Sequence, residues 1–317
     1  MEAQRTQFHP IFDGIDIGIG TWAWGDRFVW GYGNKYREED ITEAFRESIE
    51  NNVILFDTAE VYGQGKSESL LGKLLPSTNA SVKIATKIMP FPWRLGKESL
   101  RHALRGSLNR LKLEKVDLYQ MHWPIRPIPV ERWMEQMASV FQEGLISAIG
   151  VSNYNLEQTS RSVAELEKHG LSLASNQVEY HLLERRIEKN GVMDYCVQNG
   201  IKVIAYSPLA MGILSGKYTS ENPPKGARAS QYSRDLLNKI QPLIKLLKRI
   251  GQDHEGKTAS QVALNWVICK GALPIPGAKN AQQASENSSA TGWRLTSQEV
   301  QQLDEMSESV SPSSTTK

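Results

Sequence analysis

Cysteine is scarce in the sequence, and long apolar runs are absent from it. The two cysteines, Cys196 and Cys269, lie in segments with a helical pattern and form no CxxC pair, so we expect neither a disulfide framework nor a metal site. No apolar run approaches the roughly 20 residues that cross a bilayer. Residues 1–14 contain acidic side chains and no apolar segment, which a secretory signal would need. These absences predict a cytoplasmic protein without a membrane partner, or an organellar protein if a transit peptide has been removed.

An excess of either charge is also missing. The 317 residues include 37 Lys and Arg against 35 Asp and Glu, a formal net charge of +2. This balance gives no global field for nucleic acid, so we expect no nucleic-acid partner and expect anions to be recognised locally. Hydrophobic residues make up 40% and charged residues 23%, which is usual for a soluble globular protein. We predict one domain over residues 1–310, a monomer, and a disordered tail over the Ser- and Thr-rich residues 311–317.

Short runs rich in Val, Ile and Leu predict eight β-strands. Between consecutive runs lie amphipathic segments with apolar residues at spacings of three and four, the pattern of helices. Strict alternation of strand and helix indicates right-handed crossovers and a parallel sheet. Eight such units favour a closed (β/α)8 TIM barrel with an N-terminal cap segment over an open doubly wound sheet. The predicted strands cover residues 15–22, 53–58, 82–88, 116–123, 146–152, 174–180, 202–208 and 272–278.

A long interval separates the seventh predicted strand from the eighth. It contains the polar stretch SGKYTSENPPKGARASQYSR (215–234), rich in Gly, Pro, Lys and Arg. A long loop after this strand lies at the carboxyl face of a barrel, where active sites are built. The composition suits a loop that folds over an anionic ligand, and a tolerated surface insertion is the alternative.

Two glycine motifs suggest nucleotide binding but lack the context that such binding needs. Residues 18–23 read GIGTWA and match the dinucleotide pattern GxGxxG/A, but the aromatic residues that follow have no helical period. Residues 65–67 read GKS, but Glu60 replaces the glycine that a phosphate loop needs five positions earlier. We therefore expect neither a Rossmann domain nor a Walker loop, and we expect Ser67 to cap a helix that starts here.

Four polar residues stand at the ends of three successive predicted strands. Asp57 and Tyr62 follow the second strand, Lys87 ends the third and His122 ends the fourth. In a barrel these strand ends face the same rim, so we expect the four side chains to converge. An ammonium lowers the pKa of a neighbouring phenol, and a carboxylate keeps a buried ammonium charged. The set predicts a proton-transfer site in which Lys87 and Asp57 tune Tyr62.

Segments along nearly the whole chain carry a resemblance: DTAEVYG (57–63), SESLLG (67–72), ATK (85–87), LYQMHW (118–123), GVSN (150–153), NQVEYH (176–181), YSPLAMGILSGKY (206–218) and IPGAKNAQQASEN (275–287). Together they resemble the aldo-keto reductases. The resemblance implies that NADPH binds in an extended form without a Rossmann domain. It also implies that Tyr62 is the general acid, that Lys87 and Asp57 tune it, and that His122 orients the carbonyl of a small aldehyde or ketone substrate.

The resemblance further implies a cofactor site, and the residue types there suit the parts of NADPH. Ser152, Asn153 and Gln177 offer groups for the nicotinamide carboxamide, and Tyr206 offers a ring for stacking. Lys279 precedes a helix start, where NH groups and an ammonium favour a 2′-phosphate. The implied residues are Gly20, Thr21, Trp22, Asp57, Ser152, Asn153, Gln177, Tyr206, Ser207, Pro208, Leu209, Ala210, Gly212, Lys217, Arg228, Gly277, Lys279, Gln283, Glu286 and Asn287.

The sequence around Lys279 departs from many members of that family. They carry an arginine soon after the lysine, whereas this chain has Ala281, Gln282 and Gln283. No acidic residue is placed to accept a 2′-hydroxyl, so NADPH is expected over NADH, with moderate discrimination.

Tryptophans near the same rim predict an apolar wall around the substrate, which favours aromatic or terpenoid-like carbonyls. Some of these residues could instead pack the loops. Arg27, Arg94 and Arg126 could equally attract a carboxylate or phosphate, as in a pyridoxal-type aldehyde, and the sequence leaves these alternatives open. The predicted pocket residues are Trp24, Trp30, Trp93 and Trp123.

Two other functions are compatible with a barrel. One is a regulatory or binding protein that senses NADPH with little turnover, which the four polar residues disfavour. The other is a glycosidase, which needs paired carboxylates at strand ends; Asp57 and Glu179 lie far apart in the barrel order, and Lys87 would have no role.

Overall fold

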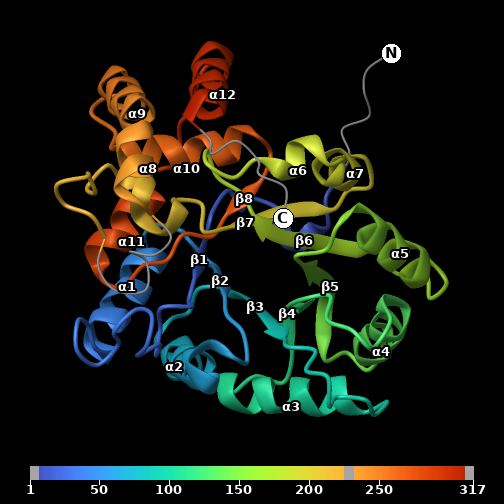
Figure 1. Ribbon diagram of the computed structural model, residues 1–317. Coiled ribbons are helices and arrows are strands. Elements are labelled where there is room, and N and C mark those ends of the chain that lie inside the picture. The colour runs from blue at the N-terminus through green and yellow to red at the C-terminus, as the bar shows by residue number, and fades with distance from the viewer. Residues whose placement is uncertain (1–6, 225–231, 311–317) are drawn as a thin grey trace.

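The computed structural model describes residues 7–224 and 232–310. Its eight strands pair in parallel in chain order, each with the next, as predicted (Figure 1). The ring is nearly closed by a parallel bridge between Gly20 and Gly277, and a Cβ on Gly20 would stand 2.8 Å from the Ile275 carbonyl oxygen. The strands are β1 Gly18–Gly20, β2 Leu55–Asp57, β3 Lys83–Ile88, β4 Val116–Met121, β5 Ile146–Ser152, β6 Leu173–Glu179, β7 Lys202–Tyr206 and β8 Leu273–Pro274.

Helices surround the strands and form the outer layer of the (β/α)8 barrel (Figure 1). Local signals set several helix starts: Asn155 with Gln158, and Thr258 with Gln261, form reciprocal capping boxes. The helices are α1 Glu38–Glu50, α2 Lys66–Leu74, α3 Ser99–Leu111, α4 Val130–Gln142, α5 Leu156–Glu167, α6 Arg186–Lys189, α7 Val192–Gln198, α8 Arg234–Lys239, α9 Gln241–Asp253, α10 Ala259–Cys269, α11 Ala281–Ser288 and α12 Ser297–Val310. Short 3-10 helices are η1 Pro10–Phe12, η2 Tyr62–Gly65, η3 Leu75–Ser77 and η4 Ala210–Ser215.

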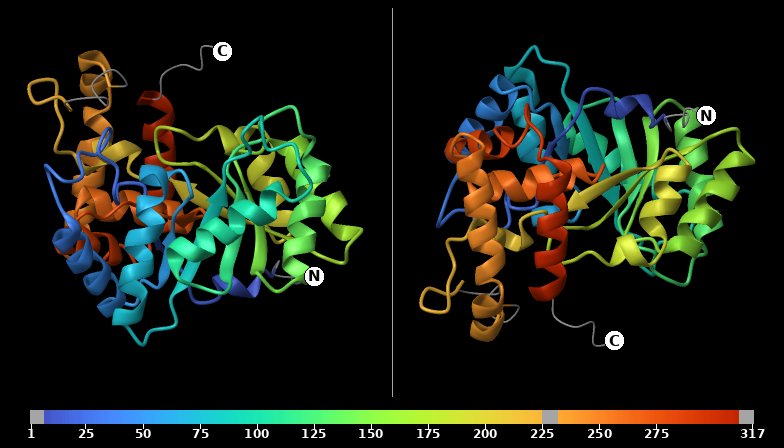
Figure 2. Two further views of the ribbon diagram at one scale, coloured as in Figure 1. Left: turned by 90° about the horizontal axis from the view of Figure 1, so that it is seen from below. Right: turned by 90° about the horizontal axis from the view of Figure 1, so that it is seen from above.

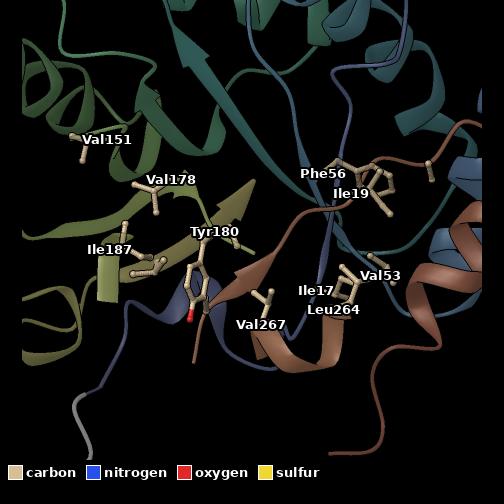
Figure 3. Close-up of a cluster of buried hydrophobic side chains, with 14 of the residues drawn as sticks. Ile17, Ile19, Val53, Phe56, Val151, Val178, Tyr180, Ile187, Leu264 and Val267 are labelled. Atoms are coloured by element: carbon tan, nitrogen blue, oxygen red, sulfur yellow. The ribbon is translucent and has the colours of Figure 1, made fainter. Parts of the chain in front are cut away.

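Two apolar clusters form the core. The larger one packs strands against helices, and Figure 3 shows Ile17, Phe56 and Leu264 as parts of it. The smaller one lies inside the barrel, where Ile11 and Phe12 of the N-terminal segment pack against strand residues of the inner wall. That segment lies at the opposite end of the molecule from the C-terminal end of α12 (Figure 2). Apolar packing therefore fills the interior at one end and leaves the carboxyl ends of the strands for a site.

The segments with misleading motifs fold as ordinary parts of the barrel. β1 leads into a loop that continues to α1, which confirms the rejection of a Rossmann turn. The expectation that Ser67 caps a helix is wrong: Gly65 precedes α2, and Ser67 lies inside the helix. The Ser67 hydroxyl contacts the backbone oxygen of Thr21 at 2.9 Å, because buried hydroxyl groups need partners and the loop after β1 provides one.

The long interval after β7 contains η4, a loop, and then α8, α9 and α10. Residues 225–231 of the polar stretch and the tail 311–317 lie outside the described residues. Within the described ranges, no helix combines the length and apolar character needed to span a bilayer. Both cysteines are free thiols.

Candidate active site

The barrel brings the four polar residues together at the carboxyl ends of neighbouring strands. Asp57 is the last residue of β2, and Tyr62 opens η2 just beyond it. Lys87 lies on β3 opposite Gln120 of β4, and His122 follows that strand. The His122 amide donates to Ile88 O over 2.9 Å, so the strand pairing continues through the site. The parallel register therefore sets the positions of these side chains.

Asp57, Lys87 and Tyr62 form a continuous hydrogen-bonded chain. Lys87 Nζ donates to Asp57 Oδ1 and, over 2.9 Å, to the Thr58 carbonyl oxygen. The same nitrogen lies 3.3 Å from the Tyr62 hydroxyl. Lys87 is fully buried and Asp57 is 2% exposed, so each charge depends on the other for compensation.

Burial dominates the electrostatics of Tyr62. It raises the pKa of the phenol, and the Lys87 ammonium opposes that shift without reversing it. The expectation that the pKa lies below its ordinary value is therefore wrong for this state, because a phenolate buried away from water loses its hydration. Burial lowers the pKa of Lys87, but Asp57 and Tyr62 raise it overall. At neutral pH the site holds a charged lysine and a protonated tyrosine, which are the states required for proton donation.

His122 lies against Tyr62 as a neutral ring. The two rings meet edge to face with centroids 5.6 Å apart. Burial, assisted by the Lys87 charge, lowers the pKa of His122 to about 3. Its Nδ1 is buried and has no hydrogen-bond partner among the described residues. The imidazole therefore stays uncharged across the physiological range and can form a hydrogen bond with a ligand.

The low pKa of His122 predicts a stability loss in acid. The unfolded chain takes up a proton near pH 6.5, whereas the folded chain does so only near 3. Between these values the free energy of unfolding falls as pH falls, by about 1.4 kcal/mol per pH unit, or about 2 kcal/mol from pH 6.5 to 5. Denaturant unfolding of wild type and His122→Gln at both pH values measures this, and the variant should lose correspondingly less. The control variant His102→Gln changes an exposed histidine and should lose as much stability as the wild type. Equal losses of stability in all three proteins would contradict the low pKa of His122.

Gln120 belongs to the site although the sequence arguments did not select it. It is fully buried on β4, and its Nε2 donates to Asp57 Oδ2 over 3.1 Å. Gln177 Nε2 donates to the same oxygen over 2.8 Å. A Cβ on Gly150 would stand 2.8 Å from the Gln120 side chain, so the glycine leaves room for it. The sequence spacing could have identified Gln120, because it lies two residues before His122 and alternate residues of a strand share a face.

A cavity of about 500 Å³ opens above these residues and contains Asp57, Tyr62 and His122 in its wall. Thr21 and Ala210, which were predicted to bind the cofactor, are buried behind the wall, and Arg228 lies outside the described residues. Lining residues that were not predicted include Val61, Met211, Ser215 and Ser260. The predicted cofactor residues that line the cavity are Gly20, Trp22, Asp57, Ser152, Asn153, Gln177, Tyr206, Ser207, Pro208, Leu209, Gly212, Lys217, Gly277, Lys279, Gln283, Glu286 and Asn287.

The donors along this cavity fit an extended dinucleotide. Asn153 Nδ2 donates to His122 O over 3.2 Å and the Tyr206 hydroxyl donates to Asn153 Oδ1 over 3.0 Å, which fixes an amide beside a ring. Lys217 and Lys279 of the same cavity wall supply positive charge. The wall thus offers amides and an aromatic ring to a nicotinamide, and cations to phosphates.

Three tryptophans line the cavity: Trp22, Trp30 and Trp123. The prediction for Trp24 is wrong, because its ring is fully buried against Phe56 and its Nε1 donates to Ala278 O over 2.8 Å. The residue therefore packs the core behind the wall.

Trp93 does not line the cavity either. It is 73% exposed and stacks on Phe91 with centroids 4.5 Å apart, so it packs its own loop. Arg94, one of the candidate anion ligands, pairs with both carboxylate oxygens of Glu60 at 2.6 and 3.0 Å. Its charge is therefore compensated within the protein.

Comparison with known proteins settles the family. The aldo/keto reductase family model matches residues 16–308. The chain belongs to this family. It is 38% identical to the chloroplastic pyridoxal reductase of Arabidopsis thaliana over 301 residues, which cover 91% of this chain and 82% of that protein. It is 32% identical to an aldo-keto reductase of Bacillus subtilis, with 90% of this chain and 88% of that protein covered.

Solved structures of aldo-keto reductases have the same fold. An aldo/keto reductase from Klebsiella pneumoniae in complex with NADP and acetate matches with a TM-score of 0.71 and 29% identity, over 94% of this chain and 92% of that one. The glycerol dehydrogenase of Gluconobacter oxydans matches with a TM-score of 0.82 and 26% identity, over 96% and 95%. The chain is thus an NAD(P)H-dependent oxidoreductase, and NADPH is its cofactor.

Proposed function

We propose that this aldo-keto reductase reduces an aldehyde or ketone to an alcohol with Tyr62 as the proton donor. The observation that carries the proposal is the Tyr62 hydroxyl in the cavity wall, 3.3 Å from a buried ammonium. The raised pKa of the phenol keeps its proton in place at neutral pH. The family membership supports reduction as the reaction.

NADPH supplies the hydride when it is bound, and the chain provides placement and proton transfer. Tyr62 donates its proton to the carbonyl oxygen as negative charge develops there. The Lys87 ammonium stabilises the phenolate that remains, and Asp57 holds the ammonium in place. The neutral His122 ring forms a hydrogen bond to the same carbonyl oxygen and orients it.

For the cofactor we propose three groups of contacts. Asn153 and Gln177 bind the carboxamide, and Tyr206 stacks on the nicotinamide ring. Lys217 pairs with the pyrophosphate and Lys279 with the 2′-phosphate. The Gln283 side chain accepts from the Lys279 amide over 3.0 Å, which fixes the backbone at that end.

For the substrate we propose a compact aromatic aldehyde without a phosphate group. Trp22, Trp30 and Trp123 form an apolar wall beside Tyr62, which suits a flat ring. No arginine of the described residues lines the cavity, so a substrate phosphate lacks a bidentate partner there. The name of the pyridoxal reductase from Arabidopsis thaliana supports a ring of this size.

Oxidation of NADPH, followed by absorbance, tests the proposal. The panel contains pyridoxal, pyridoxal 5′-phosphate, benzaldehyde, methylglyoxal and short-chain aldehydes, each repeated with NADH. We expect the highest kcat/KM for benzaldehyde or pyridoxal, and a lower value for pyridoxal 5′-phosphate than for pyridoxal. A protein that binds NADPH tightly but oxidises it with none of these compounds, even in a single turnover, would be a sensor and would contradict the proposal.

A further inference from the structure

The loop after β1 contacts Lys279 of the cavity wall through two aromatic rings. Lys279 Nζ lies 5.0 Å from the centroid of the Trp30 ring and 5.5 Å from that of Tyr36. Lys279 follows β8, whereas Trp30 and Tyr36 precede α1. Two segments distant in sequence are therefore joined by cation–π contacts.

Trp30 also belongs to the aromatic wall beside the proton donor. It meets Trp22 edge to face with centroids 5.6 Å apart, and Trp22 lies 6.4 Å from the Tyr62 ring. Trp22, Trp30, Tyr62 and Lys279 all line the same cavity. A row of contacting side chains thus runs from Lys279 through Trp30 and Trp22 to Tyr62.

The loop that carries Trp30 is held by its own hydrogen bonds. Asp26 Oδ1 accepts from the amides of Val29 and Trp30 over 2.7 and 3.0 Å. The Tyr36 hydroxyl donates to the Ala23 carbonyl oxygen. These bonds hold the backbone of the loop and keep the Trp30 ring within reach of the Lys279 ammonium.

We propose that Trp30 is a specificity-determining residue that acts on both ligands, holding Lys279 for the 2′-phosphate of NADPH and coupling that contact to the substrate wall. This rests on the proposed function in placing the 2′-phosphate at Lys279 and the substrate beside Trp22 and Trp30. A phosphate that pairs with Lys279 fixes the ammonium and the ring beneath it. Aromatic ligands of the carbonyl site then bind more tightly with NADPH than with NADH. Because binding free energies are reciprocal, such a ligand also strengthens the preference for the 2′-phosphate.

The first test is a double-mutant cycle measured by calorimetry, without turnover. The probe is adenosine 2′,5′-bisphosphate, and adenosine 5′-monophosphate is the matched probe without the 2′-phosphate. We expect Trp30→Leu to weaken the bisphosphate about 2- to 10-fold and to leave the monophosphate unchanged. We expect Lys279→Met to weaken it more, and the double variant to bind like Lys279→Met, since Trp30 acts through the lysine.

A control variant and three results bear on this test. Trp123→Leu removes a different tryptophan of the cavity wall and should leave the affinity for the bisphosphate unchanged. Independent, multiplying effects of Trp30→Leu and Lys279→Met would overturn the coupling. An unchanged affinity of Trp30→Leu for the bisphosphate would also overturn the coupling. Equal binding of both probes by the wild type would in addition overturn the placement of the 2′-phosphate at Lys279.

The second test measures binding of benzyl alcohol, a product analogue, to the protein saturated with NADPH or with NADH. We expect the wild type to bind the alcohol a few-fold more tightly with NADPH, and Trp30→Leu to bind it equally in both complexes. A difference that persists in the variant would overturn the proposal. These equilibrium results are separate from the proposed reaction, which is tested by NADPH oxidation and by the turnover of Tyr62→Phe.

Discussion

Replacing Tyr62 with phenylalanine should lower kcat by about 10²–10⁴, the usual loss when a general acid is removed. The change deletes one oxygen, which lies 3.3 Å from Lys87 Nζ, and leaves the ring beside His122 and Trp22. The dissociation constant of NADPH should stay within about twofold of wild type, because the hydroxyl is placed to act on the substrate oxygen. Steady-state kinetics and fluorescence titration with NADPH measure the two quantities.

A matched variant separates a local effect from a general one. Tyr195→Phe makes the same chemical change on α7, away from the cavity, and should retain wild-type turnover. Near-normal turnover in Tyr62→Phe would contradict the assignment of the proton donor. Loss of NADPH binding in that variant would show instead that the hydroxyl supports the cofactor.

Replacing Lys87 with methionine should reduce both turnover and stability. Among the described residues, the variant leaves the buried Asp57 carboxylate with the side-chain amides of Gln120 and Gln177 as donors. Breaking a buried pair by removing one partner costs about 3–5 kcal/mol, because the remaining charge is uncompensated. Turnover should fall by about 10² or more, because the phenolate left by proton transfer loses its stabilising cation. Denaturant unfolding and steady-state kinetics measure these changes.

A second substitution distinguishes the two losses. Asp57→Asn added to Lys87→Met removes the uncompensated charge, so it should recover part of the stability without recovering turnover. Lys83→Met removes a lysine from the same strand, but its pair with Asp117 is partly exposed and should contribute about 1 kcal/mol or less. If Lys87→Met were no less stable than Lys83→Met, Lys87 and Asp57 would not form a coupled buried pair.

The sequence was sufficient for the barrel because a short apolar run recurs eight times, with helical patterns between consecutive runs. Placing Asp57, Lys87 and His122 at strand ends then required only parallel order, which brings the carboxyl ends to one rim. The strand lengths were predicted less well. β8 has two residues where the sequence predicted seven, because apolar residues continue into the loop and do not mark the end of the strand.

Residues in loops could not be placed by pattern. Trp24 faces the core while Trp22 and Trp30 face the cavity, because the loop after β1 has no fixed period to assign side chains to a face. Arg94 was a candidate anion ligand, but Glu60, 34 positions earlier, neutralises it through a contact that only the folded chain creates. Gln120 was missed although it lies in a regular strand. The prediction selected ionisable side chains at the strand ends, such as the histidine two positions on, and the Gln120 amide is neutral.

The pKa of Tyr62 shows what sequence reasoning leaves out. A neighbouring ammonium lowers the pKa of the phenol, but the extent of burial decides whether the net shift is upward or downward. The outcome alters the role of Lys87 in the proposed reaction. Its charge stabilises the phenolate after the proton has left, whereas the unreacted phenol keeps its proton across the physiological range.

The most direct measurement of the central claim follows the transferred atoms. Wild type and Tyr62→Phe are incubated with benzaldehyde and NADPH that carries deuterium at both C4 positions, and the products are examined by mass spectrometry and NMR. We predict benzyl alcohol with one deuterium on the carbinol carbon from the wild type, and at least 10²-fold less of it from the variant in the same time. Unlabelled alcohol, or equal labelled product from both proteins, would contradict hydride transfer with Tyr62 as the proton donor.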